Sequence, residues 1–144
     1  MQLLKKTFAD QLVSAVLFGS VARGTADADS DIDILVILKD LPPGRFKRQA
    51  VLESVYQRTD AMGLTGRINC HLKTPEEARK ISLYYFDFPA DSKILHDTNR
   101  FFADIIEEVK KIIQKNGSIR KRWGKFYYWD LRPGTNADET VEIL

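Results

Sequence analysis

Two carboxylates, Asp31 and Asp33, stand one residue apart at the entrance of an apolar run that continues to Leu38. Side chains alternate along a strand, so the two carboxylates would point to the same face. Negative charges this close repel one another unless a cation lies between them, and carboxylate oxygens are suitable ligands for a divalent cation. The pair therefore predicts a site for Mg²⁺ or Mn²⁺.

A Gly-Ser turn, Gly19 and Ser20, ends the apolar segment that precedes these carboxylates. Glycine lets a backbone approach a ligand closely, and the Ser20 hydroxyl and neighbouring N–H groups can donate to a phosphate as well as cap a helix. Arg23 follows one helical turn later, where it can reach a phosphate, close over the site or simply interact with the helix dipole. Together with the carboxylates, the turn predicts a site for a metal-bound nucleoside triphosphate.

The apolar pattern also predicts the elements that must position these residues. The run over 32–38 is nearly continuous, which is typical of a central strand covered on both faces. The other elements are strands over 14–18, 67–72 and 92–96, the last at an edge, and helices over 2–13, 20–24, 45–62 and 98–115, with a further helix after Thr74. Because strands and helices interleave, we predict an α/β (α+β) fold with a small mixed β-sheet flanked by helices.

For two of these helices the sequence predicts further details, namely how one begins and which side chains of the other face the core. Thr74, Pro75 and Glu77 have the spacing of a capping box with proline at the first helical position. In the helix over 45–62, the apolar side chains expected to face the core are Phe46, Ala50, Val51, Val55 and Tyr56. Its end is predicted at Gly63.

The composition changes after Gly117, so we predict a domain over 1–116 and a basic-aromatic extension over 117–144. Within 118–131, four basic residues stand among five aromatic ones, and an acidic end follows. Three interpretations stay open. The segment packs back onto the domain as an extra hairpin, docks a protein partner, or stacks on the bases of a nucleic acid.

The whole chain sets further bounds. Its 144 residues, 44% hydrophobic and 29% charged, are ordinary for one soluble domain with a core. A net charge of +2 gives no bulk argument for binding nucleic acid. The single cysteine, Cys70, excludes an internal disulfide and fits a reducing cytoplasm. No apolar run approaches the ~20 residues needed to span a bilayer, so we expect a cytoplasmic protein without a membrane partner.

The spacing of the chemical residues resembles a known signature. Gly19-Ser20, ten residues, and then Asp31-Ile32-Asp33-Ile34 resemble the motif of the DNA polymerase β-like nucleotidyltransferase superfamily. The fuller stretches, GSVARG from Gly19 and DSDID from Asp29, resemble its minimal nucleotidyltransferase (MNT) group. The resemblance covers about residues 14–38, and the order of elements to residue 116 agrees with it.

The resemblance implies a reaction. Asp31 and Asp33 would bind Mg²⁺, Gly19, Ser20 and Arg23 would bind the triphosphate, and an acceptor hydroxyl would attack the α-phosphorus and release pyrophosphate. It also implies a third carboxylate on a later strand. The matching strand here has no acid, and Asn69 and His71 share the face where that acid would stand. His71 aligns best with it, and a neutral imidazole can ligate a metal or act as a base.

We therefore predict a Mg²⁺-dependent nucleotidyltransferase that transfers a nucleoside monophosphate, plausibly AMP from ATP, to a macromolecule. The resemblance implies a helical HEPN toxin as the partner of such an antitoxin. The alternative is a binding module that holds the nucleotide, or only keeps the fold, because the third carboxylate is missing. A third hypothesis is an RNA-modifying enzyme that grips RNA with its extension.

Overall fold

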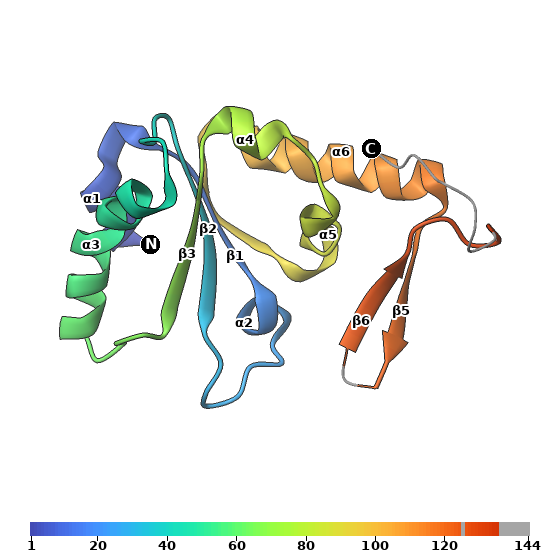
Figure 1. Ribbon diagram of the computed structural model, residues 1–144, viewed down its shortest axis with the longest axis horizontal. Coiled ribbons are helices and arrows are strands. Elements are labelled where there is room, and N and C mark those ends of the chain that lie inside the picture. The colour runs from blue at the N-terminus through green and yellow to red at the C-terminus, as the bar shows by residue number, and fades with distance from the viewer. Residues whose placement is uncertain (125, 136–144) are drawn as a thin grey trace.

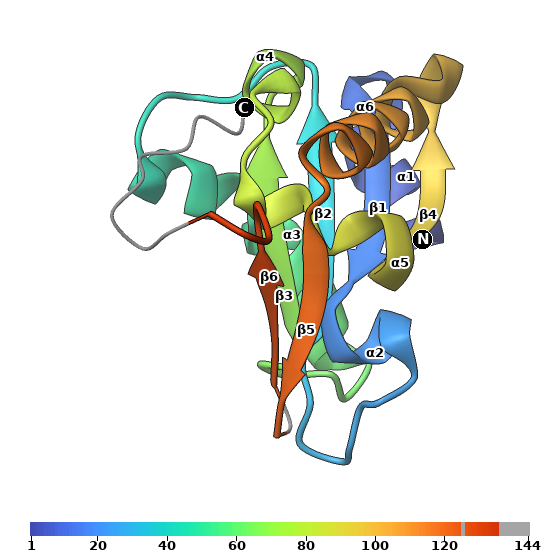
Figure 2. The same ribbon diagram turned by 90° about the vertical axis from the view of Figure 1, so that its right-hand side faces the viewer.

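The computed structural model describes residues 1–124 and 126–135. A four-stranded mixed sheet has the strand order β3-β2-β1-β4, and two further strands form a separate hairpin (Figures 1 and 2). The strands are β1 Leu12–Phe18, β2 Ile32–Leu38, β3 Ile68–Lys73, β4 Lys93–Asp97, β5 Ile119–Trp123 and β6 Phe126–Asp130. Strands β2 and β3 run parallel, and the other pairs are antiparallel. The predicted fold class is confirmed.

Helices cover both faces of the sheet (Figure 1). They are α1 Gln2–Phe8, α2 Gly19–Arg23, α3 Arg45–Ala61, α4 Pro75–Arg79, α5 Phe88–Asp91 and α6 Phe101–Asn116, with short 3₁₀ turns at Ala9–Gln11, Leu83–Tyr85 and Thr98–Arg100. Among the described residues, no helix is long and apolar enough to cross a membrane.

The core lies in two layers, one on each side of β2. Val36 and Leu38 pack with α1 and α3 through Leu4, Leu52 and Val55, among others. Leu35 and Ile37 point the other way, into a cluster that includes Tyr85, Phe86, Phe88, Phe102, Ile105 and Val109. Because side chains alternate along β2, this strand contributes buried residues to both layers. The prediction of a central strand covered on both faces is confirmed.

The first helix is shorter than predicted. The helix expected over 2–13 ends at Phe8, because Ala9 takes a positive φ of 42° and a 3₁₀ turn follows. Leu12 begins β1 and pairs with Leu38 of β2. The helical spacing of apolar residues was therefore misleading at this end, where Leu12 is buried by the sheet rather than by a helix.

The core face of α3 also differs from the prediction. Phe46 is 90% exposed and Ala50 is exposed, while Leu52, Val55 and Thr59 are buried. At 3.6 residues per turn, Phe46 lies nine residues, or about 180° around the helix, from Val55. The expectation that Phe46 and Ala50 face the core was wrong because the buried stripe has a different register.

Other local predictions are confirmed. Thr74 Oγ1 accepts a hydrogen bond from the Glu77 N–H at 3.3 Å, and Glu77 Oε2 accepts one from the Thr74 N–H at 3.0 Å, which completes the capping box. The edge strand is β4, shifted by one residue from the predicted range. Helix α6 ends at the left-handed Gly117.

Strands β5 and β6 pair only with each other and lie beyond α5, away from the main sheet (Figure 1). Trp129 Nε1 donates to Asp87 Oδ1 at 2.9 Å, and its ring meets Phe86 edge-on with centroids 5.5 Å apart. Segment 118–131 is thus a hairpin that touches the domain through one of its faces. The acidic end of the expected extension, 136–144, lies outside the described residues.

Candidate functional site

The end of β1 is pressed against the carboxylate of Asp33. Phe18, the last residue of β1, pairs with Asp33 of β2, and Gly19 then begins α2 with a φ of +76°. A Cβ built on Gly19 would lie 2.6 Å from Asp33 Oδ2, closer than two such atoms can approach. Only glycine fits here, for its left-handed backbone and for its lack of a side chain. The first turn of α2 therefore stands directly beside a carboxylate.

Asp33 is joined to His71 through one amide group. Asn69, which pairs with Asp33 across the parallel strands, places Nδ2 3.0 Å from Asp33 Oδ1 and 3.1 Å from His71 Nε2. An amide nitrogen carries two N–H donors, so it can donate to both groups at once. If Asn69 donates in this contact, His71 Nε2 is the acceptor, and a neutral imidazole with that arrangement has its proton on Nδ1. His71 Nε2 itself lies 4.0 Å from Asp33 Oδ1.

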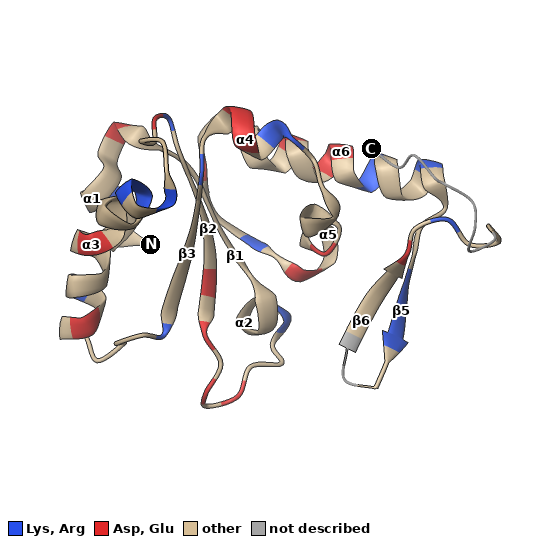
Figure 3. Ribbon diagram, viewed as in Figure 1, with Lys and Arg blue, Asp and Glu red and all other residues tan. Residues whose placement is uncertain are grey.

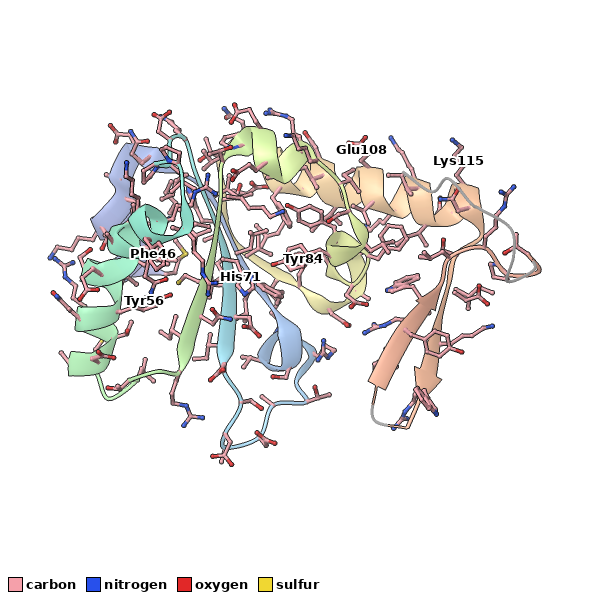
Figure 4. All side chains as sticks on the ribbon, viewed as in Figure 1. Phe46, Tyr56, His71, Tyr84, Glu108 and Lys115 are labelled. Atoms are coloured by element: carbon pink, nitrogen blue, oxygen red, sulfur yellow. The ribbon has the colours of Figure 1, made fainter. Side chains whose placement is uncertain are left out.

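Aromatic rings hold His71 in place. Tyr84 Oη lies 3.5 Å from His71 Nδ1, and its ring lies nearly parallel to the imidazole with centroids 6.1 Å apart (Figure 4). Phe18 meets the imidazole edge-on at 5.1 Å. Burial raises the pKa of the Tyr84 hydroxyl, which therefore stays neutral. These contacts fix the plane of the ring.

Sequence reasoning missed Tyr84 and Lys73. Tyr84 comes from the 3₁₀ turn after α4, where the sequence shows only a run of aromatic residues. Lys73 continues the alternation of Asn69 and His71 along β3, which could have placed it on the same face. Its Nζ lies 5.3 Å from the centroid of the Tyr84 ring, and burial lowers its pKa.

Asp31 lies just outside β2, exposed, at the end of an acidic stretch (Figure 3). The preceding loop holds itself together, since Asp27 Oδ1 accepts hydrogen bonds from the Ser30 hydroxyl and the Asp29 N–H. Arg67 donates to the carbonyl of Ala28 from outside the loop. Asp31 thus directly precedes β2, two residues before Asp33, where the acidic loop joins the strand.

The remaining predicted residues lie on α2. Ser20 is half-buried in the first turn, next to Gly19. The guanidinium of Arg23 is turned toward α5, where Nη1 lies 3.6 Å from Asp91 Oδ2. The structure therefore brings Gly19, Asp33 and His71 together, and it directs Arg23 to a neighbouring carboxylate.

The donors at this site fit one kind of metal ion and not another. Within residues 1–124 and 126–135, no three His, Cys, Asp or Glu side chains are grouped to hold a metal. Mg²⁺ is commonly held by one or two carboxylates while substrate phosphates and water complete its octahedron. Asp31 and Asp33 fit an ion of that kind, which arrives with a nucleotide. They do not fit an ion that the protein must hold alone.

Two hollows flank Asp33 and His71. One, of about 230 Å³, lies between α2 and α5 and is lined by Phe18, Gly19, Arg23, Tyr84, Phe88 and Asp91, among others. The other, of about 580 Å³, lies along the outer side of β3 and is lined by residues that include Arg45, Arg48, Gln49, Asn69 and His71. The first hollow reaches Gly19, which contacts Asp33, and the second reaches Asn69, which is hydrogen-bonded to Asp33.

Comparisons with known proteins agree with this arrangement. Residues 2–122 match a family model described as "Nucleotidyltransferase domain". The chain is 36% identical over 118 residues to "Putative protein adenylyltransferase MJ1305" of Methanocaldococcus jannaschii, which covers 80% of this chain and 79% of that protein. It is 40% identical over 42 residues to "Putative protein adenylyltransferase MJ0141" of the same organism, covering 29% of this chain and 42% of that protein.

A crystal structure with 21% sequence identity is similar in fold. It is described as "Crystal structure of the toxin-antitoxin with AMP-PNP" and superposes with a TM-score of 0.51 at 21% sequence identity. The match covers 81% of this chain and 88% of that one.

Proposed function

Because the chain belongs to the nucleotidyltransferase domain family, we propose that it transfers AMP from ATP to a hydroxyl group of another protein. The observation that carries the proposal is the contact between Gly19 and Asp33. It puts the first turn of α2, where N–H groups can bind a phosphate, beside a carboxylate suited to a metal ion. The naming of the relative MJ1305 as a protein adenylyltransferase supports the choice of AMP and of a protein acceptor.

Each side of the site has its own task. Gly19 and Ser20 bind the phosphates through N–H groups and the Ser20 hydroxyl, on the α2 side. Asp31 and Asp33 would hold Mg²⁺ or Mn²⁺, which neutralises charge on the phosphate oxygens and on the departing pyrophosphate. The acceptor approaches from the hollow along β3, where His71 Nε2 lies at the boundary between the two sides.

The transfer is a single displacement. The acceptor oxygen forms a bond to the α-phosphorus while the bond from that phosphorus to the bridging oxygen breaks, and pyrophosphate leaves with the electron pair. His71 Nε2 takes the proton of the hydroxyl once the hydroxyl replaces the Asn69 N–H as its hydrogen-bond partner. Asn69 remains bonded to Asp33 and keeps that carboxylate oriented.

We assign the acceptor to a HEPN-type protein partner. The MNT resemblance implies this pairing, and a solved structure with a similar fold is described as a toxin–antitoxin with AMP-PNP. The hollow along β3, of about 580 Å³, extends from His71 to the start of α3, where a side chain of such a partner could approach. Phe46, which is 90% exposed on that helix, offers an apolar contact for such a segment.

A second candidate is a module that binds the nucleotide without transferring it. The observation that favours it is the chemistry of β3, where Asn69 and His71 stand on the site face and no carboxylate does. Without a base, an acceptor hydroxyl would react far more slowly.

The two candidates separate in one experiment. The protein is incubated with α-labelled ATP, Mg²⁺ or Mn²⁺ and a HEPN-type protein from the same organism, with the double variant Asp31→Asn/Asp33→Asn as the control. If the partner becomes labelled and the double variant abolishes this labelling, the transferase is supported. Nucleotide binding that depends on Asp33 without any label transfer supports the module, and absence of metal-dependent nucleotide binding refutes both.

A further inference from the structure

A second hollow on the α2 side is lined by arginines from distant parts of the chain. It has a volume of about 550 Å³ and lies between α2, α5 and the hairpin. Its lining consists of Arg23, Thr25, Asp91, Arg120, Arg122 and Tyr127. Figure 3 shows the basic colouring along β5. The lining thus has three guanidinium groups and one carboxylate.

Arg120 is held rigidly in this hollow. Its guanidinium is paired with Asp91 and stacks on the Tyr127 ring, with its central carbon 4.3 Å from the ring centroid. Arg120 Nε is buried and lies 3.3 Å from Asp87 Oδ1, yet it makes no hydrogen bond. A planar group fixed by a ring and two carboxylates loses little further freedom when it binds an anion.

Arg122 brings a charge that no carboxylate neutralises among the described residues. Its Nε donates to the carbonyl of Gly124 at 2.9 Å, and no ion pair involves its guanidinium in that part of the chain. Asp91 is meanwhile shared between Arg23 and Arg120. The hollow therefore has excess positive charge, which suits a phosphate with its several oxygens.

The register of the hairpin separates this basic face from its other face. Arg122 pairs with Tyr127 and Arg120 with Trp129, so these four side chains point the same way, toward the domain that Trp129 contacts. Lys121 lies on the opposite face of β5, where its Nζ pairs with Asp130 at 2.6 Å. One positive charge can therefore be removed from either face of β5, at Arg122 or at Lys121.

The arginine hollow is continuous with the candidate site. Arg23 and Asp91 line both this hollow and the smaller one that reaches Gly19 and Phe18. Arg23 stands four residues after Gly19 on α2, a rise of about 6 Å along the helix axis. A triphosphate that begins beside Asp33 and runs along α2 would carry its outer end toward Arg23.

We propose that Arg23, Arg120 and Arg122 form an anion site for the outer phosphates of the nucleoside triphosphate, so that the C-terminal hairpin is part of the nucleotide site. This inference rests on the proposed function, because it takes a triphosphate as the ligand. It adds residues from β5 that the signature around Gly19 and Asp33 does not contain.

The test compares Arg122→Gln with Lys121→Gln in the full chain. Both variants lose one positive charge from β5, one on each face. Calorimetry measures binding of inorganic pyrophosphate without metal, of ATP with Mg²⁺, and of AMP, and circular dichroism checks the fold. We expect Arg122→Gln to weaken pyrophosphate and ATP about tenfold, the loss of one charge-assisted hydrogen bond, and to leave AMP unchanged. Lys121→Gln should change each affinity less than twofold.

The outcomes distinguish this inference from the proposed function. If ATP binding requires Asp33 but is equal in the two variants, the anion site is refuted and the transferase proposal stands. If AMP weakens as much as ATP in Arg122→Gln, the assignment to the outer phosphates is refuted. If pyrophosphate and ATP depend on Arg122 but no label is ever transferred, the anion site stands and the transferase proposal fails.

Discussion

Gly19 and Asp33 leave no room for a methyl group between them, since a Cβ on Gly19 would lie 2.6 Å from Asp33 Oδ2. The contact links the end of β1 to the entrance of β2 and makes the Gly19-Ser20 turn, our proposed phosphate site, and the carboxylate one structural unit. Both were predicted from the sequence, but their contact was not.

The first prediction follows from this contact. Gly19→Ala should push the Asp33 carboxylate aside and weaken Mg²⁺-dependent ATP binding at least tenfold in calorimetry. Gly24→Ala is the matched control, because Gly24 has a nearly equal φ of +73° and nothing within 4 Å of an added Cβ. Both variants should lose about 1–2 kcal/mol of stability from the left-handed backbone. Equal ATP affinity in the two variants would show that the contact does not matter for binding.

The second prediction concerns the two histidines. His71→Ala should lower the rate of label transfer by roughly 10²–10⁴-fold, the usual contribution of a general base, while ATP affinity changes little. His96→Ala serves as the control, because His96 lies on the edge strand β4 and its Nε2 contacts Thr98 at 3.3 Å. A His71→Ala protein that transfers label at the normal rate would exclude His71 as the base.

The third prediction concerns the order of metal and nucleotide binding. Residues 1–124 and 126–135 contain no group of three acidic, His or Cys side chains that could hold a metal. Asp31 and Asp33 should therefore bind Mn²⁺ weakly alone and tightly once ATP supplies phosphate oxygens. Electron paramagnetic resonance of free Mn²⁺ measures both affinities. In the presence of ATP, the wild-type protein should increase the amount of Mn²⁺ bound, and Asp33→Asn should abolish this increase. Tight Mn²⁺ binding to the protein without nucleotide would contradict the site as described.

The fourth prediction concerns stability and pH. Arg48 donates to both oxygens of Glu77, at 2.9 and 2.7 Å, and this lowers the pKa of Glu77 from its ordinary value of 4.5. A carboxyl whose folded pKa is lowered stabilises the protein fully above its unfolded pKa, and that stabilisation is lost as pH falls through the folded pKa. The pair should contribute about 0.5–1 kcal/mol at pH 7, because Glu77 is 37% exposed and water screens it.

Glu77→Gln tests this value, because glutamine can still complete the capping box. Urea unfolding should show a deficit at pH 7 that disappears toward pH 3. Glu53→Gln, on the exposed side of α3, is the control and should show no such deficit. A deficit in Glu77→Gln that is the same at both pH values would assign it to the cap rather than to the ion pair.

The features that the sequence predicted well are those that neighbouring residues decide. The capping box at Thr74, the left-handed glycine after α6 and the continuous apolar run of β2 each depend on a few adjacent side chains. The same holds for the alternation that puts Asn69 and His71 on one face.

The features that it did not predict depend on contacts between distant segments. Leu12 extends β1 because the sheet buries it, and Phe46 faces outward because the packing of Leu52 and Val55 sets the register of α3. Arg23 turns to Asp91, which lies 68 positions further along the chain, and Tyr84 reaches His71 from a turn with no distinctive pattern. Hydrophobic pattern and secondary-structure propensity contain no information about such tertiary contacts.

The hairpin has a thermodynamic consequence of its own. A two-stranded hairpin has little stability alone, and this one has a basic inner face and an outer face on which Trp123 is 79% and Tyr128 49% exposed. The hairpin is ordered by its contacts with the domain, through Arg120 to Asp87 and Asp91 and through Trp129 to Asp87. A partner on the outer face that moves β5 would therefore change the affinity of the inner face for phosphates, and linkage requires phosphates to change the affinity for that partner by the same factor.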